Sequence, residues 1–123
     1  MTKRTILLVD DDESHRQVMA DCVKAHGYAV VQAGHGGEAV EYLKRNDLPD
    51  AIVLDLEMPV MGGRELLRKL EATTDWSRIP AIVVSAHTEV SVDAFDRAAA
   101  RLRKPLDLPT LVEVIERCWK SET

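Results

Sequence analysis

The sequence contains few cysteines and no long apolar run. Its two cysteines, Cys22 and Cys118, cannot build the disulfide framework of a small secreted domain, and they suit a reducing compartment. No apolar run approaches the roughly 20 residues that a membrane-spanning helix needs. The first apolar run covers only residues 6–9, which is too short for a signal peptide. We therefore expect a cytoplasmic protein with no membrane partner.

The chain also lacks an excess of basic residues. It has 16 Lys and Arg residues against 21 Asp and Glu residues, so the formal net charge is −5. Nucleic-acid binding needs a basic face, and an acidic domain of this size is a poor candidate for it. We find no internal repeat, low-complexity segment or linker in the 123 residues. The sequence therefore predicts one domain over residues 1–123 and no nucleic-acid partner.

Short apolar runs alternate with amphipathic segments along the chain. Four of the runs are continuous, as is typical of parallel strands covered on both faces, and a weaker fifth run is typical of an edge strand. The five runs are residues 6–9, 29–31, 51–54, 81–84 and 101–103. Between them, apolar residues recur every three or four positions, as in helices that bury one face. This alternation predicts an α/β domain with a parallel sheet.

Polar residues stand where the predicted strands end. Asp10 and Asp11 follow the first strand, Asp55 follows the third and Ser85 follows the fourth. Lys104 follows the weak fifth strand. Open parallel sheets bind ligands outside the carboxyl ends of their strands, so we expect these side chains to lie together.

Several of these residues have an ordinary structural explanation when each is taken alone. Asp12 and Glu13 precede or open a predicted helix, where acidic residues commonly cap the helix and interact with its dipole. Ser85 alone could be a turn residue, and Lys104 alone could be a solvated surface lysine. The histidines His15, His26 and His35 show no partner spacing, so we expect surface or helix-end roles for them. Only the joint arrangement at the strand ends indicates a functional site.

Clustered carboxylates repel one another unless a cation lies among them. With oxygen ligands only, and no His or Cys at ligand spacing, the suitable ion is Mg²⁺, with Mn²⁺ as a substitute. Mg²⁺ is commonly held by one or two carboxylates together with a phosphate oxygen, so the pattern also indicates a phosphoryl group. One carboxylate could then be a nucleophile, while Lys104 and the metal ion neutralise the transferred group.

Four motifs in this order resemble the receiver domain of two-component response regulators. They are residues 9–12, 52–63, 83–86 and 104–105, which read VDDD, IVLDLEMPVMGG, VVSA and KP. The resemblance covers essentially the whole chain. It implies a flavodoxin-like, doubly wound sheet of five parallel strands in the order 2-1-3-4-5, with five helices. Only 19 positions separate the serine and the lysine of the last two motifs, so we expect a shortened fourth helix.

The resemblance implies a metal ligand set. Asp11 would bind Mg²⁺ directly and Asp10 would bind it through water. Asp55 and the backbone carbonyl of Glu57 would be further ligands. Mn²⁺ would be able to replace Mg²⁺ at these oxygen atoms.

The resemblance also implies the phosphoryl chemistry. Asp55 would accept a phosphoryl group from a kinase histidine. Ser85 would turn toward that group, and Lys104 would pair with it. The bond between Lys104 and Pro105 would be cis.

These roles imply a signalling receiver that catalyses only its own phosphorylation and dephosphorylation and acts by switching conformation. Its partners would be a sensor histidine kinase or phosphotransfer protein and a downstream protein. No further domain follows Thr123, so we expect a stand-alone receiver. Two alternatives remain open. One is a Mg²⁺-dependent phosphohydrolase with Asp55 as nucleophile and Glu57 as second acid, and the other is an interaction module that is never phosphorylated.

One position departs from the pattern of the family in a way that affects the output surface. Arg101 stands where the family usually has an aromatic residue. Burying an unpaired guanidinium costs far more than burying a ring, so we expect Arg101 to stay exposed. With Arg97 and Arg103 it would form a small basic patch on an acidic domain.

Overall fold

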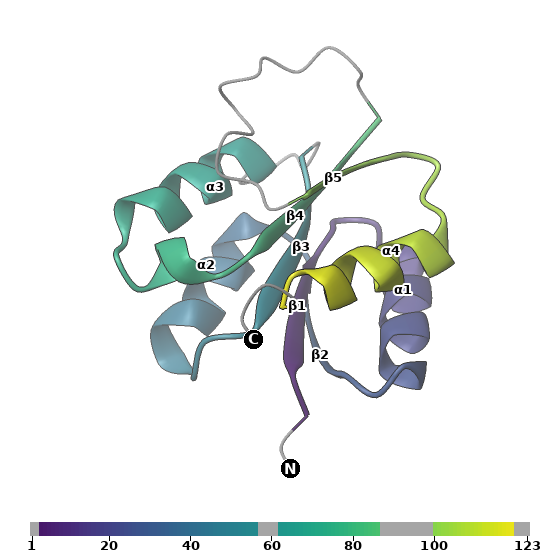
Figure 1. Cartoon of the computed structure of the whole chain (residues 1–123). Helices are drawn as coiled ribbons and strands as arrows, with labels where there is room; N and C mark the ends of the chain where they lie inside the picture. The colour runs from purple at the N-terminus through teal and green to yellow at the C-terminus, as the bar shows by residue number, and fades with distance from the viewer. Residues whose placement is uncertain (1–2, 57–61, 87–99, 120–123) are drawn as a thin grey trace.

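The computed structural model describes residues 3–56, 62–86 and 100–119. In that part of the chain, five strands form one parallel sheet in the order β2-β1-β3-β4-β5, with helices on both faces (Figure 1). This arrangement confirms the predicted α/β architecture and strand order. The strands are β1 (Thr5–Val9), β2 (Ala29–Ala33), β3 (Ala51–Asp55), β4 (Ala81–Ser85) and β5 (Ala100–Arg103).

Four α-helices lie in the described residues, where the sequence predicted five over the whole chain. They are α1 (Glu13–Ala25), α2 (Gly36–Arg45), α3 (Gly63–Ala72) and α4 (Leu108–Arg117). A short 3₁₀ helix, η1 (Trp76–Arg78), precedes β4. The shortened helix expected between β4 and β5 falls on residues 87–99, which lie outside the described residues. The helix predicted as the last of five is therefore α4.

The sheet divides the apolar core into two layers. Leu7 and Val9 of β1 belong to the layer that includes α2 and α3. Ile6 and Leu8 of the same strand belong to the layer that includes α1 and α4. A strand buried on both faces needs apolar residues at every position, which explains the continuous runs in the sequence. Each fully buried Leu or Ile side chain contributes about 1.5–3 kcal/mol to the free energy of folding.

Side chains fix where the helices begin. The Asp12 carboxylate accepts a hydrogen bond from the His15 N–H at 3.0 Å and caps α1, as the sequence predicted. The Asp107 carboxylate caps α4 in the same way, through the Thr110 N–H at 3.1 Å. Helix α1 is followed by Gly27, whose positive φ of 93° favours glycine. These caps set the starting points of the helices that flank the carboxyl edge of the sheet.

The amino edge of the sheet joins the two ends of the described chain. The Trp119 indole N–H donates to the Asp50 carbonyl oxygen at 3.3 Å, and the Arg4 guanidinium lies 4.2 Å from the centre of the Trp119 ring. The Asp50 carboxylate accepts a hydrogen bond from the Thr5 N–H at 2.7 Å. Polar groups at this edge therefore serve to hold β1, β3 and the end of the chain together.

Two further predictions concern the cysteines and the membrane. Cys22 and Cys118 are both free thiols, as expected, and burial raises the pKa of the Cys118 thiol. Among the described residues, no helix is both long enough and apolar enough to cross a bilayer.

Candidate functional site

Buried polar side chains gather at the carboxyl edge of the sheet. In the part of the chain that the structure describes, three polar residues are buried: Asp10, Asp55 and Ser85, which are 2%, 4% and 6% exposed. Asp10 follows β1, while Asp55 and Ser85 are the last residues of β3 and β4. These three strands are neighbours in the sheet. Burying carboxylates costs free energy unless they are compensated, so their gathering at one edge indicates a site rather than a stabilising core.

Three carboxylates of this edge could hold a metal ion. Asp10, Asp11 and Asp55 each offer one oxygen atom, and these atoms all lie within 4.8 Å of one another. Oxygen ligands at the usual distance of about 2.1 Å from Mg²⁺ can be at most about 4.2 Å apart across the ion. The cluster therefore fits Mg²⁺ after a small movement, or with one carboxylate bound through water. Asp11 is exposed, so the cluster is open to solvent on that side.

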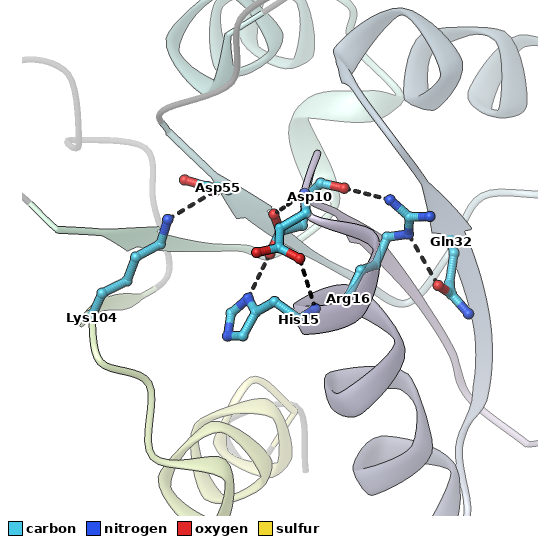
Figure 2. A network of polar contacts seen from close by, with 7 residues as sticks. Asp10, His15, Arg16, Gln32, Asp55 and Lys104 are labelled. Carbon is cyan, nitrogen blue, oxygen red and sulfur yellow. Dashed lines mark hydrogen bonds and ion pairs between the residues drawn. The ribbon is translucent and has the colours of Figure 1, made fainter.

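Lys104 supplies a positive charge to the buried carboxylate of β3. Its Nζ atom lies 2.9 Å from Asp55 Oδ2, and its side chain is 30% exposed. Figure 2 shows the Lys104 side chain extending toward Asp55. The Lys104 backbone N–H donates to the Ser85 carbonyl oxygen at 3.0 Å, which ties the end of β5 to the end of β4. The structure thus brings Lys104, Asp55 and the end of β4 together, as the motif spacing predicted. The Lys104–Pro105 peptide bond is cis, as the resemblance implied.

Ser85 occupies the neighbouring strand end. In the register of β3 and β4, Asp55 is paired with Val84, and Ser85 is the next residue. The Leu56 N–H donates to the Val84 carbonyl oxygen at 3.1 Å and extends the pairing past Asp55. The hydroxyl-bearing residue of β4 therefore stands one position beyond the partner of Asp55.

Two residues without a predicted site role, His15 and Arg16, contact Asp10, and Gln32 in turn contacts Arg16. His15 Nδ1 lies 2.7 Å from Asp10 Oδ2 (Figure 2). Arg16 donates from Nη1 to the Asp10 carbonyl oxygen at 2.6 Å and from Nε to Gln32 Oε1 at 3.0 Å. His15, for which a surface or helix-end role was predicted, therefore has a buried partner in Asp10. His15 and Arg16 follow Asp10 by five and six positions, but this spacing alone does not show which side chains reach Asp10.

Two predictions about this region fall on undescribed residues. Glu57, whose backbone carbonyl was predicted as a metal ligand, and Arg97 lie outside the described residues. Arg101 is exposed, as predicted, and so is Arg103. Ala100 and Leu102, which alternate with these arginines along β5, pack against the core layer of α1 and α4. The two arginines thus share the opposite side of this edge strand.

The sequence is similar to several proteins of known family. The profile of the family described as response regulator receiver domain matches residues 6–116. The protein PilH of Pseudomonas aeruginosa is 33% identical over 113 residues, which cover 89% of this chain and 93% of PilH. The polar-differentiation response regulator DivK of Brucella anthropi is 28% identical over 116 residues, covering 92% of this chain and 94% of DivK.

Solved structures agree with the sequence matches. The structure of a response regulator receiver protein from Pseudomonas putida superposes with a TM-score of 0.88 at 29% identity, covering 95% of this chain and 98% of the other. A CheY-like response regulator receiver domain protein from Methanospirillum hungatei gives a TM-score of 0.86 at 25% identity, covering 98% and 97%. Taken with the strand order and the acidic strand ends, these matches show that the chain belongs to the response regulator receiver domain family of two-component signalling.

Proposed function

We propose that Asp55 is the phosphoryl acceptor of this receiver domain. The observation that carries the proposal is the meeting of a buried carboxylate and an ammonium group at 2.9 Å, beside two further carboxylates, at the carboxyl edge of the sheet. The donor would be the phosphohistidine of a sensor kinase or of a phosphotransfer protein. The domain would work in the cytoplasm, where such donors present their phosphohistidine.

In the reaction, an oxygen atom of the Asp55 carboxylate forms a bond to phosphorus while the bond between phosphorus and the histidine nitrogen breaks. The nitrogen keeps the electron pair of that bond and takes up a proton. Lys104 Nζ, at 2.9 Å from Asp55 Oδ2, is placed to neutralise an oxygen of the transferred group. A Mg²⁺ ion held by Asp10, Asp11 and Asp55, with the Glu57 carbonyl as a further ligand, would supply the remaining positive charge.

The conformational switch would run through Ser85 and Lys104. A phosphoryl group on Asp55 adds acceptor oxygens that the Ser85 hydroxyl and the Lys104 ammonium can bind. Because the Lys104 N–H is bonded to the Ser85 carbonyl oxygen, a movement of one residue is transmitted to the other strand end. The resulting change in affinity for a downstream protein would correspond to a coupling of about 1–3 kcal/mol.

In this reaction the domain is phosphorylated by its donor protein, and it does not act as an enzyme on a separate substrate. It would catalyse its own phosphorylation and the later hydrolysis of the aspartyl phosphate, and nothing else. The upstream partner is then a kinase or phosphotransfer protein, and the downstream partner is a protein that binds one of the two states.

The test is labelling by acetyl phosphate with Mg²⁺, read by intact mass. The wild-type chain should gain one phosphoryl group and Asp55→Asn should gain none. Asp50→Asn is a matched control, because Asp50 stands immediately before the same strand and its amide replacement still accepts the Thr5 N–H. Labelling of Asp55→Asn at the wild-type rate would overturn the assignment.

A further inference from the structure

His15 contacts the most buried carboxylate of the acidic cluster. Its Nδ1 atom lies 2.7 Å from Asp10 Oδ2, and the side chains of His15 and Asp10 are 33% and 3% exposed. An ionised carboxylate can only accept hydrogen bonds, so the ring nitrogen is the donor. This is a short, directed contact to a group that is almost fully removed from water.

The Asp10 carboxylate is held at both of its oxygen atoms. Oδ1 accepts a hydrogen bond from the Asp12 N–H at 2.9 Å, and Oδ2 faces the His15 ring. The first of these donors belongs to the backbone and is present whatever the side chains are. The second is the only one of the two that depends on the identity of a side chain.

The backbone of His15 is held at the start of α1. The His15 N–H donates to Asp12 Oδ1 at 3.0 Å, which places His15 in the first turn of the helix. The next residue, Arg16, binds the carbonyl oxygen of Asp10 and the side chain of Gln32 on β2 (Figure 2). Consecutive residues of α1 therefore hold the backbone and the carboxylate of Asp10 from one side.

The other buried acid of the cluster is held in a different way. Asp55 pairs with the Lys104 ammonium, which is placed to meet the transferred group. If Asp55 is phosphorylated, the Lys104 ammonium can move to bind the phosphoryl group. The His15 ring instead contacts Asp10, which is not the residue that is modified. His15 thus acts on the part of the cluster that stays constant during the reaction.

We propose that His15 is a positioning residue that keeps the Asp10 carboxylate oriented for divalent-cation binding. The proposal rests on the proposed function, since it takes the acidic cluster as the metal site. It assigns His15 no contact with the phosphoryl group or with the metal ion. Removing the outer partner of a ligating carboxylate typically lowers metal affinity by 10- to 100-fold. Because Asp10 is expected to act through water, we expect about a tenfold loss, at the lower end of that range.

The experiment measures Mn²⁺ affinity of the full chain at one fixed pH, by electron paramagnetic resonance of the free ion. His15→Leu removes the donor but keeps a bulky, helix-compatible side chain, and we expect its affinity to be about tenfold weaker than that of the wild type. His15→Asn places an amide nitrogen where Nδ1 stood, and it should restore affinity to within about twofold. His26→Ala is the control, because His26 follows the same helix and its ring nitrogen Nδ1 lies 2.9 Å from the Cys22 carbonyl oxygen rather than beside the acidic cluster.

A second measurement separates positioning from a merely structural role. In acetyl phosphate labelling, His15→Leu should need about ten times more Mg²⁺ for half-maximal rate but should reach the wild-type rate at saturating Mg²⁺. If His15→Leu folds poorly, His15→Ala measured in the same way answers the same question. Wild-type Mn²⁺ affinity in both donor-free variants, or no rescue by asparagine, would overturn the proposal.

A failure of the proposed function looks different. Asp11→Asn removes a carboxylate of the cluster itself, so it should lose Mn²⁺ binding if the cluster is the metal site. Equal Mn²⁺ binding by the wild type and Asp11→Asn would reject the metal site and, with it, the proposed function. A clear Asp11→Asn effect together with an unaffected His15→Leu would reject only the role of His15.

Discussion

Two aspartates at the two ends of strand β3 have different environments. Asp50 precedes the strand, is exposed, and accepts the Thr5 N–H at 2.7 Å through its carboxylate. Asp55 ends the strand, is 4% exposed, and pairs with Lys104. At the amino edge of the sheet the aspartate side chain stabilises the fold by a hydrogen bond. At the carboxyl edge the same residue type is buried in an acidic cluster. The comparison shows that a polar residue becomes informative when folding buries it next to groups that it repels.

Lys104→Ala should produce the largest change at the carboxyl edge. We expect the rate of labelling of Asp55 by acetyl phosphate to fall about a hundredfold, because the ammonium that we propose neutralises the transferred group is lost. Lys44→Ala is the control, since Lys44 is exposed in the last turn of α2. The two rates are compared by intact-mass time courses at saturating Mg²⁺. Similar labelling rates in Lys104→Ala and Lys44→Ala would show that Lys104 does not neutralise the transferred group.

Trp119→Ala tests the opposite edge. Trp119 is 8% exposed and connects Arg4 and Asp50, so its truncation should lower the free energy of unfolding by about 3 kcal/mol. Urea denaturation followed by circular dichroism measures this loss. Under conditions where the variant is folded, its labelling rate should match that of the wild type. A slowed rate in the folded variant would show that the two edges are coupled.

Mg²⁺ should stabilise the domain through the carboxyl edge alone. At a concentration ten times the dissociation constant, bound Mg²⁺ adds about 1.4 kcal/mol, which raises the melting temperature by about 5 °C for a domain of this size. The shift is measured by thermal melts with Mg²⁺ and with a chelator. Asp11→Asn should reduce it strongly and Asp50→Asn should leave it unchanged. Identical melts of the wild type with Mg²⁺ and with chelator would contradict the metal site.

Asp12 sharpens the comparison, because it is an acid at the carboxyl edge with a structural task. Asp12→Ala removes the cap of α1 and should lower the free energy of unfolding by about 1 kcal/mol. Asp12→Asn, which keeps a capping oxygen, should lose much less. Urea denaturation of both variants gives the difference. Equal stability of Asp12→Ala and the wild type would show that the cap contributes little here.

The sequence was sufficient to predict the sheet because burial on both faces forces continuous apolar runs. Strands β1, β3 and β4 were predicted within one residue of their observed ends. Strand β2 was predicted two residues short. Its apolar run is interrupted by Gln32, a polar residue that an edge strand tolerates. Asp10, Asp55 and Ser85 were predictable for a related reason, since a polar residue that ends a buried apolar run stands out.

His15 and Arg16 could not be predicted in the same way. Their partners are the carboxylate and the carbonyl of Asp10, and whether those groups are within reach depends on where α1 starts and how it packs against β1 and β2. Polar residues in the first turn of a helix are common, so their presence alone distinguishes nothing. The three-dimensional path of the chain supplies the information that the spacing lacks.

The contact between Arg4 and Trp119 brings the beginning and the end of the described chain within a few ångströms of each other, at the edge of the sheet away from the acidic cluster. A short linker between these two points would close the chain into a ring at a small entropic cost. The domain is therefore suited to circular permutation, and a reporter attached near either point would lie away from the acidic cluster.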